Sequence, residues 1–266
     1  MTWPGSRTFR DLHSGPAPLL LPNAWDVASA LVLVADGCPA IGTTSLGIAA
    51  AAGRPDAARA VRALTAELAD RLATLPVPVS ADLEDGFADE PQAVADLVAE
   101  LPVAGINLED STGGRLVDPR LHAAKVAAVK ERCPEVFLNV RVDTFWLGEH
   151  ATTGDTLRRA ERYVEAGADG VFVPGRLTEE QIRGLTAALN VPVNVLATSD
   201  HTVPRLAELG VRRISTGSLL FRVALDEAAA VVRRLRAGQP APGATTYGEL
   251  NALVAAHDAR QPGRPL

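Results

Sequence analysis

The chain has 266 residues, of which 47% are apolar and 22% are charged, and its formal net charge is −6. This size and composition are typical of one large α/β domain with ample material for a core. The negative charge and the lack of a basic stretch argue against a nucleic-acid-binding surface. No apolar run reaches the roughly 20 residues of a membrane span, and the first residues lack the apolar segment of a signal peptide. We therefore expect a soluble, cytoplasmic protein.

Eight short segments rich in apolar and β-branched residues are predicted as strands. They cover residues 19–24, 39–45, 77–84, 103–110, 136–143, 170–175, 191–197 and 211–218. Amphipathic segments with helical spacing lie between them. They are marked by Val61 to Leu72, by Val94 to Leu101 after Pro91, and by Ile182 to Leu189 after the capping box that begins at Thr178. Asp89 is predicted to cap the helix that begins near Pro91.

Continuous apolar strands that alternate with helices indicate a parallel sheet covered by helices. At this length we predict an α/β fold in which the strands close into a single (β/α)8 TIM barrel spanning residues 1–266. An open, doubly wound sheet is the alternative fold, but no Gly-rich phosphate turn follows the first strand. Residues 238–266 are predicted to form a hinge, "GQPAPG", and an additional C-terminal helix whose apolar stripe needs a partner surface.

Polar side chains gather at the carboxyl ends of the predicted strands, where barrel enzymes carry their chemistry. Asp82, Glu84 and Glu109 end adjacent strands, so their carboxylates should converge. Clustered carboxylates remain ionised only when a cation compensates them. With oxygen ligands and no nearby Cys or His, the favoured ion is Mg²⁺, with Mn²⁺ as a possible substitute. The alternative is that these acids cap helices and pair with Arg141.

Three further features could bind a substrate anion. Arg141 ends the fifth strand and could bind a carboxylate through two hydrogen bonds, or it could form an internal ion pair with Glu109 or Asp143. The turn Ser45–Gly47 offers backbone N–H groups, and Asn194 lies near the end of the seventh strand. The two cysteines, Cys38 and Cys133, precede strands at the opposite end of the barrel and are interpreted as packing residues.

With these residues in place, the chain resembles the isocitrate lyase / phosphoenolpyruvate mutase superfamily over about residues 20–222. The segments that carry the resemblance include "LPNAWDVASA", "GTTSLGIAAAAGRPD", "VSADLEDGF", "GINLEDS" and "NVRVDTF". The resemblance implies a Mg²⁺ ion held largely through waters by Asp82, Glu84 and Glu109. It also implies substrate binding by the turn of Ser45, Leu46 and Gly47 and by Arg141, and it matches Asp56 to the family's acid after the second strand.

The chain also departs from the family pattern. The "KKCGH"-type loop of isocitrate and methylisocitrate lyases is replaced by "STGGRLVDPRLH", which has neither Lys nor Cys. The Lys and Asn of the phosphonate mutases are missing too. The proton carrier is therefore left open between Asp56 and a metal-bound water.

The resemblance implies a Mg²⁺-dependent enzyme, a carbon–carbon lyase, that acts through an enolate on a small 2-oxo acid, a dicarboxylate, or its 2-hydroxy-acid precursor. The alternatives are a phosphonopyruvate-type mutase or hydrolase that acts on a P–C bond, and a barrel that binds 2-oxo acids without turnover. The resemblance also implies a homo-oligomer, a dimer or a tetramer, in which the C-terminal helix of residues 238–266 packs on another subunit.

Overall fold

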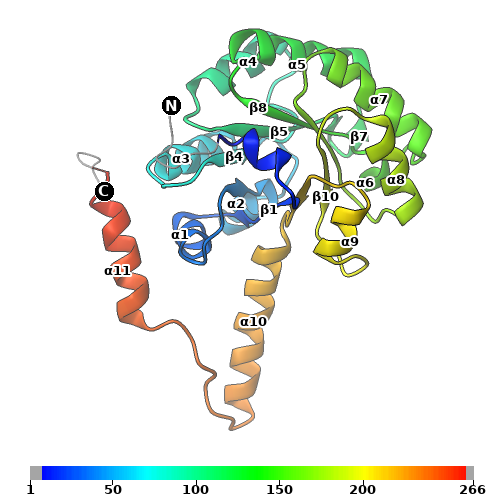
Figure 1. Ribbon diagram of the computed structural model, residues 1–266. Coiled ribbons are helices and arrows are strands. Elements are labelled where there is room, and N and C mark those ends of the chain that lie inside the picture. The colour runs from blue at the N-terminus through cyan, green and yellow to red at the C-terminus, as the bar shows by residue number, and fades with distance from the viewer. Residues whose placement is uncertain (1–7, 262–266) are drawn as a thin grey trace.

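The computed structural model describes residues 8–261, and a ring of parallel strands forms its centre (Figure 1). In spatial order the main sheet contains β1 (Leu19–Leu21), β11 (Arg213–Ser215), β10 (Val193–Leu196), β9 (Gly170–Val173), β8 (Phe137–Arg141), β5 (Gly105–Glu109), β4 (Val79–Asp82), β3 (Ile41–Thr43) and β2 (Asn23–Ala24). Only Pro22 separates β1 from β2, so these are two halves of one strand. Because β1 pairs with β11 and β2 pairs with β3, the ring closes with eight strand positions. The predicted (β/α)8 barrel is confirmed.

One buried side chain, Asn23, joins the first, second and last strands where the ring closes. Its Nδ2 donates to the carbonyl of Thr43 (2.6 Å), and its Oδ1 accepts the backbone N–H groups of Thr216 and Gly217 (3.0 Å each). Gly42 is required beside it, since a Cβ at this position would lie 2.6 Å from Asn23 Nδ2. This closure fixes the carboxyl ends of the strands, where the polar residues gather.

Helices surround the ring. Their bounds are η1 (Asp11–Ser14), α1 (Val27–Ala35), α2 (Ser45–Ala51), α3 (Arg62–Leu72), α4 (Pro91–Glu100), α5 (Pro119–Arg132), α6 (Thr144–Leu147), α7 (Thr153–Glu165), α8 (Glu179–Ala188), α9 (Val203–Glu208), α10 (Leu219–Arg236) and α11 (Tyr247–Asp258). The capping box of α8 forms between Thr178 and Gln181 as predicted. The cap assigned to Asp89 is wrong: Glu90 is the N-cap residue of α4, and Asp89 binds Arg59 instead.

Two short elements beside the barrel mouth have no counterpart in the prediction. A hairpin of β6 (Ser111–Thr112) and β7 (Arg115–Leu116) follows β5, and α6 follows β8. Gly113 and Gly114 both have positive φ, which suits the tight two-residue turn that joins the hairpin strands. The backbone N–H of Leu116 donates to Glu149 Oε2 (3.3 Å), so the hairpin is tied to the segment after α6.

The core lies between the ring and its helices, and it contains two clusters of buried aliphatic residues. Cys38 and Cys133 are free and pack against these clusters, as expected. A third cluster closes the amino-terminal end of the barrel; it consists of Phe9, Leu19, Leu21, Ala40 and Phe137. Within residues 8–261, none of the helices combines the length and the apolar character needed to cross a membrane.

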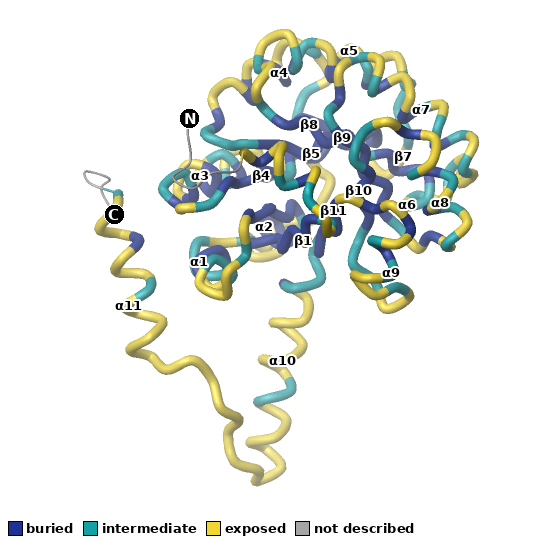
Figure 2. Tube along the Cα trace, viewed as in Figure 1, coloured by how far each residue is buried: buried dark blue, intermediate teal, exposed yellow. Residues whose placement is uncertain are grey.

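The last two helices behave differently from each other. Helix α10, which follows the last strand, projects away from the barrel and is exposed along nearly its whole length (Figures 1 and 2). Its exposed apolar residues include Val223, Leu225, Val232 and Leu235. The segment 238–243 forms neither helix nor strand, and α11 beyond it packs on α1 of the same chain. Both helices keep exposed apolar residues, among them Val232 and Leu235 on α10 and Leu250 and Val254 on α11. The packing of the C-terminal helix on another subunit stays a prediction.

Candidate active site

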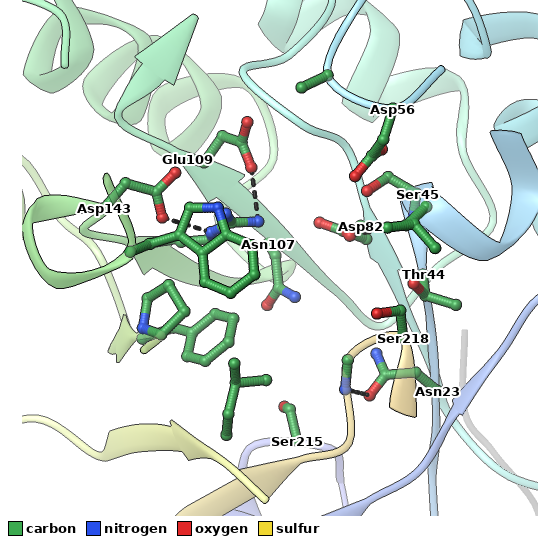
Figure 3. A pocket seen from close by; sticks show the side chains of 18 of the residues that line it. Asn23, Thr44, Ser45, Asp56, Asp82, Asn107, Glu109, Asp143, Ser215 and Ser218 are labelled. Atoms are coloured by element: carbon green, nitrogen blue, oxygen red, sulfur yellow. Dashed lines mark hydrogen bonds and ion pairs between the residues drawn. The ribbon is translucent and has the colours of Figure 1, made fainter. Parts of the chain in front are cut away.

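A cavity of about 180 Å³ opens at the carboxyl ends of the strands (Figure 3). Its walls carry carboxylates on facing sides, with Asp56 and Asp82 across from Glu109. The acidic residues that line it are Asp56, Asp82, Glu84, Glu109 and Asp143. Two positively charged residues line the described cavity, Arg141 and Arg222. The site is therefore strongly acidic.

Strand β4 and the residue two positions beyond it supply the first two carboxylates. Asp82 Oδ2 accepts the backbone N–H of Ser45 (3.1 Å), and Glu84 Oε2 accepts the backbone N–H of Arg59 (3.0 Å). Glu84 has a φ of 50°, a strained value for a residue with a Cβ. Its Oε1 is buried and has no hydrogen-bond partner within the described residues. A carboxylate oxygen left in this state is available to a ligand.

Asp85, the third acid of the stretch "DLED", has a structural role. It is buried, and the Arg59 guanidinium binds both of its carboxylate oxygens. Thr112 donates to Oδ2 (2.5 Å), and Lys125 Nζ donates to the Asp85 backbone carbonyl (2.8 Å). Adjacent acids of one loop thus have opposite surroundings, since Asp85 is fully compensated and Glu84 is not.

The electrostatics of the cavity acids reflect their burial. Loss of solvation, reinforced by the charges of Asp56 and Asp82, raises the pKa of Glu84 to about 7. Burial also raises the pKa of Asp82 and, more strongly, that of Glu109, although the charge of Arg141 opposes both increases. The positive charge near these carboxylates therefore does not offset the loss of their solvation.

Arg141 is tied to two acids, as one alternative interpretation of the sequence held. Its Nη1 lies 2.7 Å from Glu109 Oε2, and its Nε lies 2.6 Å from Asp143 Oδ1. The guanidinium carbon lies 5.6 Å from the centre of the Trp146 ring. Arg141 also lines the cavity. Its charge is shared between neighbouring carboxylates and the cavity.

The structure brings most of the predicted site residues together. Asp56, Ser45 and Leu46 line the cavity together with the three proposed metal acids and Arg141. Gly47 and Asn194 do not line it. The N–H of Gly47 is directed to Thr44 Oγ1 (3.5 Å) as a helix cap, and Asn194 donates to Ser215 Oγ (3.0 Å) inside the barrel. The prediction placed Asn194 too near the mouth because its strand continues to Leu196.

Sequence reasoning missed an apolar wall of the cavity. Its residues are Trp146, Leu147, Phe172, Pro174 and Leu196. It also missed Asn107, which lines the cavity from the middle of β5. A signal for Asn107 exists in the sequence, since the polar residue interrupts an otherwise apolar strand, "GINLE". Trp146 lies on a four-residue helix that gives no periodic signal.

The donor set fits a hydrated Mg²⁺ ion. No three acidic, histidine or cysteine side chains among residues 8–261 converge closely enough to bind a metal ion directly. Mg²⁺ commonly keeps several of its waters and takes only one or two carboxylates. The unpartnered Oε1 of Glu84 and the raised pKa values of the cavity acids both indicate a missing positive charge.

The fold and the site define a (β/α)8 barrel with an acidic cavity at the catalytic end. A family model described as phosphoenolpyruvate phosphomutase matches residues 9–236. The chain therefore belongs to this family, within the isocitrate lyase / phosphoenolpyruvate mutase superfamily. The superfamily is one of enzymes, namely lyases, mutases and hydrolases.

Known relatives extend over most of the chain. It is 49% identical over 253 residues to an uncharacterized protein of Mycobacterium tuberculosis, covering 95% of this chain and 98% of that protein. It is 30% identical over 199 residues to 2-methylisocitrate lyase of Bacillus subtilis, covering 70% of this chain and 64% of the lyase. A solved structure of phosphonopyruvate hydrolase with oxalate and Mg²⁺ has the same fold, with a TM-score of 0.83 and 21% identity over 94% of this chain and 95% of that chain.

Proposed function

We propose that the protein is a Mg²⁺-dependent carbon–carbon lyase that acts on a small 2-oxo acid or on its 2-hydroxy-acid precursor. The observation that carries the proposal is the charge of the cavity, where five carboxylates face two guanidinium groups. Similarity to 2-methylisocitrate lyase supports the reaction class. The Mg²⁺ in phosphonopyruvate hydrolase supports the choice of ion. Mn²⁺ could replace Mg²⁺ on the same oxygen ligands.

Asp82, Glu84 and Glu109 are the residues proposed to hold the ion. When bound, Mg²⁺ would act as a Lewis acid toward a chelating carboxylate and its adjacent oxygen. The three side chains are held in place by different contacts. The N–H groups of Ser45 and Arg59 fix Asp82 and Glu84, whereas Glu109 is held through its ion pair with Arg141.

Arg141 and the first turn of α2 are proposed to orient the substrate. The Arg141 guanidinium lines the cavity between Glu109 and Asp143 and can bind a substrate carboxylate at the same time. Ser45 and Leu46 line the opposite wall. Gly47 contributes only as part of this turn. Asp56 lies on the loop after α2 and is the proposed proton carrier, since it reaches the cavity with its carboxylate.

A carbon substrate suits the cavity better than a phosphonate. A phosphonate group is polar on all of its oxygens and gains little from apolar neighbours. The apolar wall of Trp146, Leu147, Phe172, Pro174 and Leu196 instead offers contacts to a carbon chain. The leaving group is therefore proposed to lie against this wall.

A binding and turnover experiment tests the proposal. Oxalate, oxaloacetate, methylisocitrate, isocitrate and phosphonopyruvate are titrated calorimetrically with Mg²⁺ and with EDTA, and the reaction mixtures are then followed by NMR. We expect binding that needs Mg²⁺ and that Glu84→Ala abolishes, and cleavage of one of the carbon acids. Binding that survives EDTA would refute the metal role. Tight binding without product would identify a barrel that binds but does not react, and turnover of phosphonopyruvate alone would identify a P–C bond enzyme.

We also propose that the chain forms a homo-oligomer in the cytoplasm. The exposed apolar residues of α10 support the association, because a long helix with such a face is stabilised when another surface covers it. A dimer and a tetramer are both compatible with this surface.

A further inference from the structure

Below the cavity, the barrel interior holds a layer of polar side chains. Such interiors are usually filled by branched apolar residues. In this protein the interior of the ring carries Ser80, Asn107, Asn139, Asn194 and Arg213, all at most 4% exposed. Three polar atoms of this layer have no hydrogen-bond partner within the described residues: Ser80 Oγ, Asn194 Oδ1 and Arg213 Nη1. This layer needs an explanation beyond packing.

Arg213 crosses the barrel from one side to the other. It begins on β11, and its Nη2 donates to Oδ1 of Asn107 on β5 (3.1 Å). Three strand positions separate β11 from β5 in either direction around the ring, so these strands are diametrically opposed. The Arg213 Nε donates to Ser215 Oγ (3.1 Å). No acidic side chain of the described chain forms an ion pair with Arg213, although it is completely buried.

The contact fixes the orientation of the Asn107 amide. A guanidinium only donates hydrogen bonds, so the Asn107 atom that faces Arg213 must be its oxygen. Asn139 Nδ2 lies 2.9 Å from the same oxygen and supplies a second donor. With Oδ1 held by both, Nδ2 is turned to the other side, where Asn107 lines the cavity (Figure 3). No described residue accepts a hydrogen bond from Asn107 Nδ2.

We propose that Asn107 is a substrate-binding residue, which donates its amide N–H to an oxygen of the bound acid, and that Arg213 is the positioning residue that directs this N–H into the cavity. The inference rests on the proposed binding of a 2-oxo acid at this site. It adds a donor at the cavity floor, opposite the open mouth, to the contacts from Arg141 and the α2 turn.

The cost of burying Arg213 supports a role in the site. A buried cation without an anionic partner destabilises a folded protein, and an apolar residue of similar size would fill the same space at lower cost. Burial lowers the pKa of Arg213 to about 9, while the charge of Asp82 opposes the decrease. The cation thus lies close enough to the acidic cavity to interact with the charge of Asp82.

Oxalate binding in the presence of Mg²⁺ tests the proposal on the full chain. Titration calorimetry compares the wild type with Asn107→Asp, Asn107→Ala and Arg213→Met. Arg212→Met is the matched control, since Arg212 is the adjacent residue of the same segment and is exposed. We expect oxalate to bind roughly ten- to hundredfold more weakly to both Asn107 variants, which is the usual effect of a lost hydrogen bond to a charged group. Arg213→Met should weaken binding severalfold because the amide can then turn, and Arg212→Met should bind as the wild type does.

Thermal unfolding separates this role from a structural one. In Asn107→Asp the new carboxylate pairs with Arg213, so the melting temperature should stay constant or rise while oxalate binding falls. Arg213→Lys keeps the charge and one hydrogen-bond donor toward Asn107, so it should retain most of the oxalate binding. It is measured in place of Arg213→Met if that variant does not fold. If Asn107→Asp and Asn107→Ala bind oxalate with wild-type affinity, this inference is refuted and the proposed function is not. A wild type that does not bind oxalate with Mg²⁺ would refute both this inference and the proposed function.

Discussion

The substitution Glu84→Gln should stabilise the protein in metal-free buffer at alkaline pH. Glu84 is 3% exposed, and its Oε1 has no hydrogen-bond partner in the described structure. Glutamine has nearly the same shape, and its amide oxygen can still accept the Arg59 N–H that Glu84 Oε2 accepts at 3.0 Å. The substitution therefore removes a buried negative charge and little else.

The magnitude follows from the pKa of Glu84, which burial raises from 4.5 to about 7. Each tenfold change in proton affinity corresponds to about 1.4 kcal/mol, so ionising Glu84 in the folded state costs at most about 3 kcal/mol. The folded protein binds this proton more tightly than the unfolded chain does. Stability from this group is therefore fully present below about pH 4.5 and is lost as the pH rises through about 7.

Urea unfolding in EDTA measures the effect. At about pH 8 we expect Glu84→Gln to exceed the wild type by about 1–3 kcal/mol, and at about pH 5 by about 1 kcal/mol or less. Glu131→Gln, at an exposed glutamate of α5, is the control and should change stability little at either pH. Added Mg²⁺ at about pH 8 should raise the free energy of unfolding of the wild type more than that of Glu84→Gln.

Two outcomes would contradict this reasoning. A stability difference between Glu84→Gln and the wild type that does not change with pH would show that Glu84 is not held in an uncompensated state. An equal response of both proteins to Mg²⁺ would show that Glu84 does not contribute to the metal site. Either result would leave the strained φ of Glu84 without a functional reason.

Two further variants test the loop behind the site and the exposed surface of α10. Arg59→Ala leaves the buried carboxylate of Asp85 without its guanidinium partner and should lower the free energy of unfolding by about 2 kcal/mol or more in urea denaturation, whereas Arg54→Ala, at an exposed arginine of the same loop, should have little effect. Replacing Val232 and Leu235 of α10 by serine should lower the molar mass measured by light scattering; an unchanged mass would show that this face of α10 is not the subunit contact.

The sequence was sufficient to predict the barrel and most of the acidic site. Parallel strands in a closed ring bring their carboxyl ends to one edge, so Asp82, Glu84 and Glu109 had to line one cavity once their strands were recognised. Asp56 was different, because it lies on a loop and its place at the cavity came from the family resemblance. Elements that depend on local pattern, such as the capping box of α8, were equally predictable.

The contacts that cross the barrel could not be predicted. Strand order identifies neighbours, but the partner of a long side chain on the far side of the ring depends on the stagger of all eight strand positions. Arg213 and Asn107, which are 106 residues apart, form such a pair. The prediction for Asn194 was wrong for a related reason. Leu196 lines the cavity, but Asn194, two residues earlier on β10, lies inside the barrel.

Glu84 and Asp85 are neighbours in the chain, but only the negative charge of Asp85 is balanced by basic side chains. Basic residues are therefore present near the cavity, although they do not pair with Glu84. Arg59 is close to both residues: its backbone N–H binds Glu84, but its guanidinium turns to Asp85 and Asp89. Lys125 likewise lies beside Asp85 and not beside the cavity. Nearby positive charges are thus taken up by structural carboxylates, while the carboxylates at the cavity keep raised pKa values. A fold selected for stability alone gains by the opposite distribution, so the uncompensated acids support the proposed binding of a cation from solution.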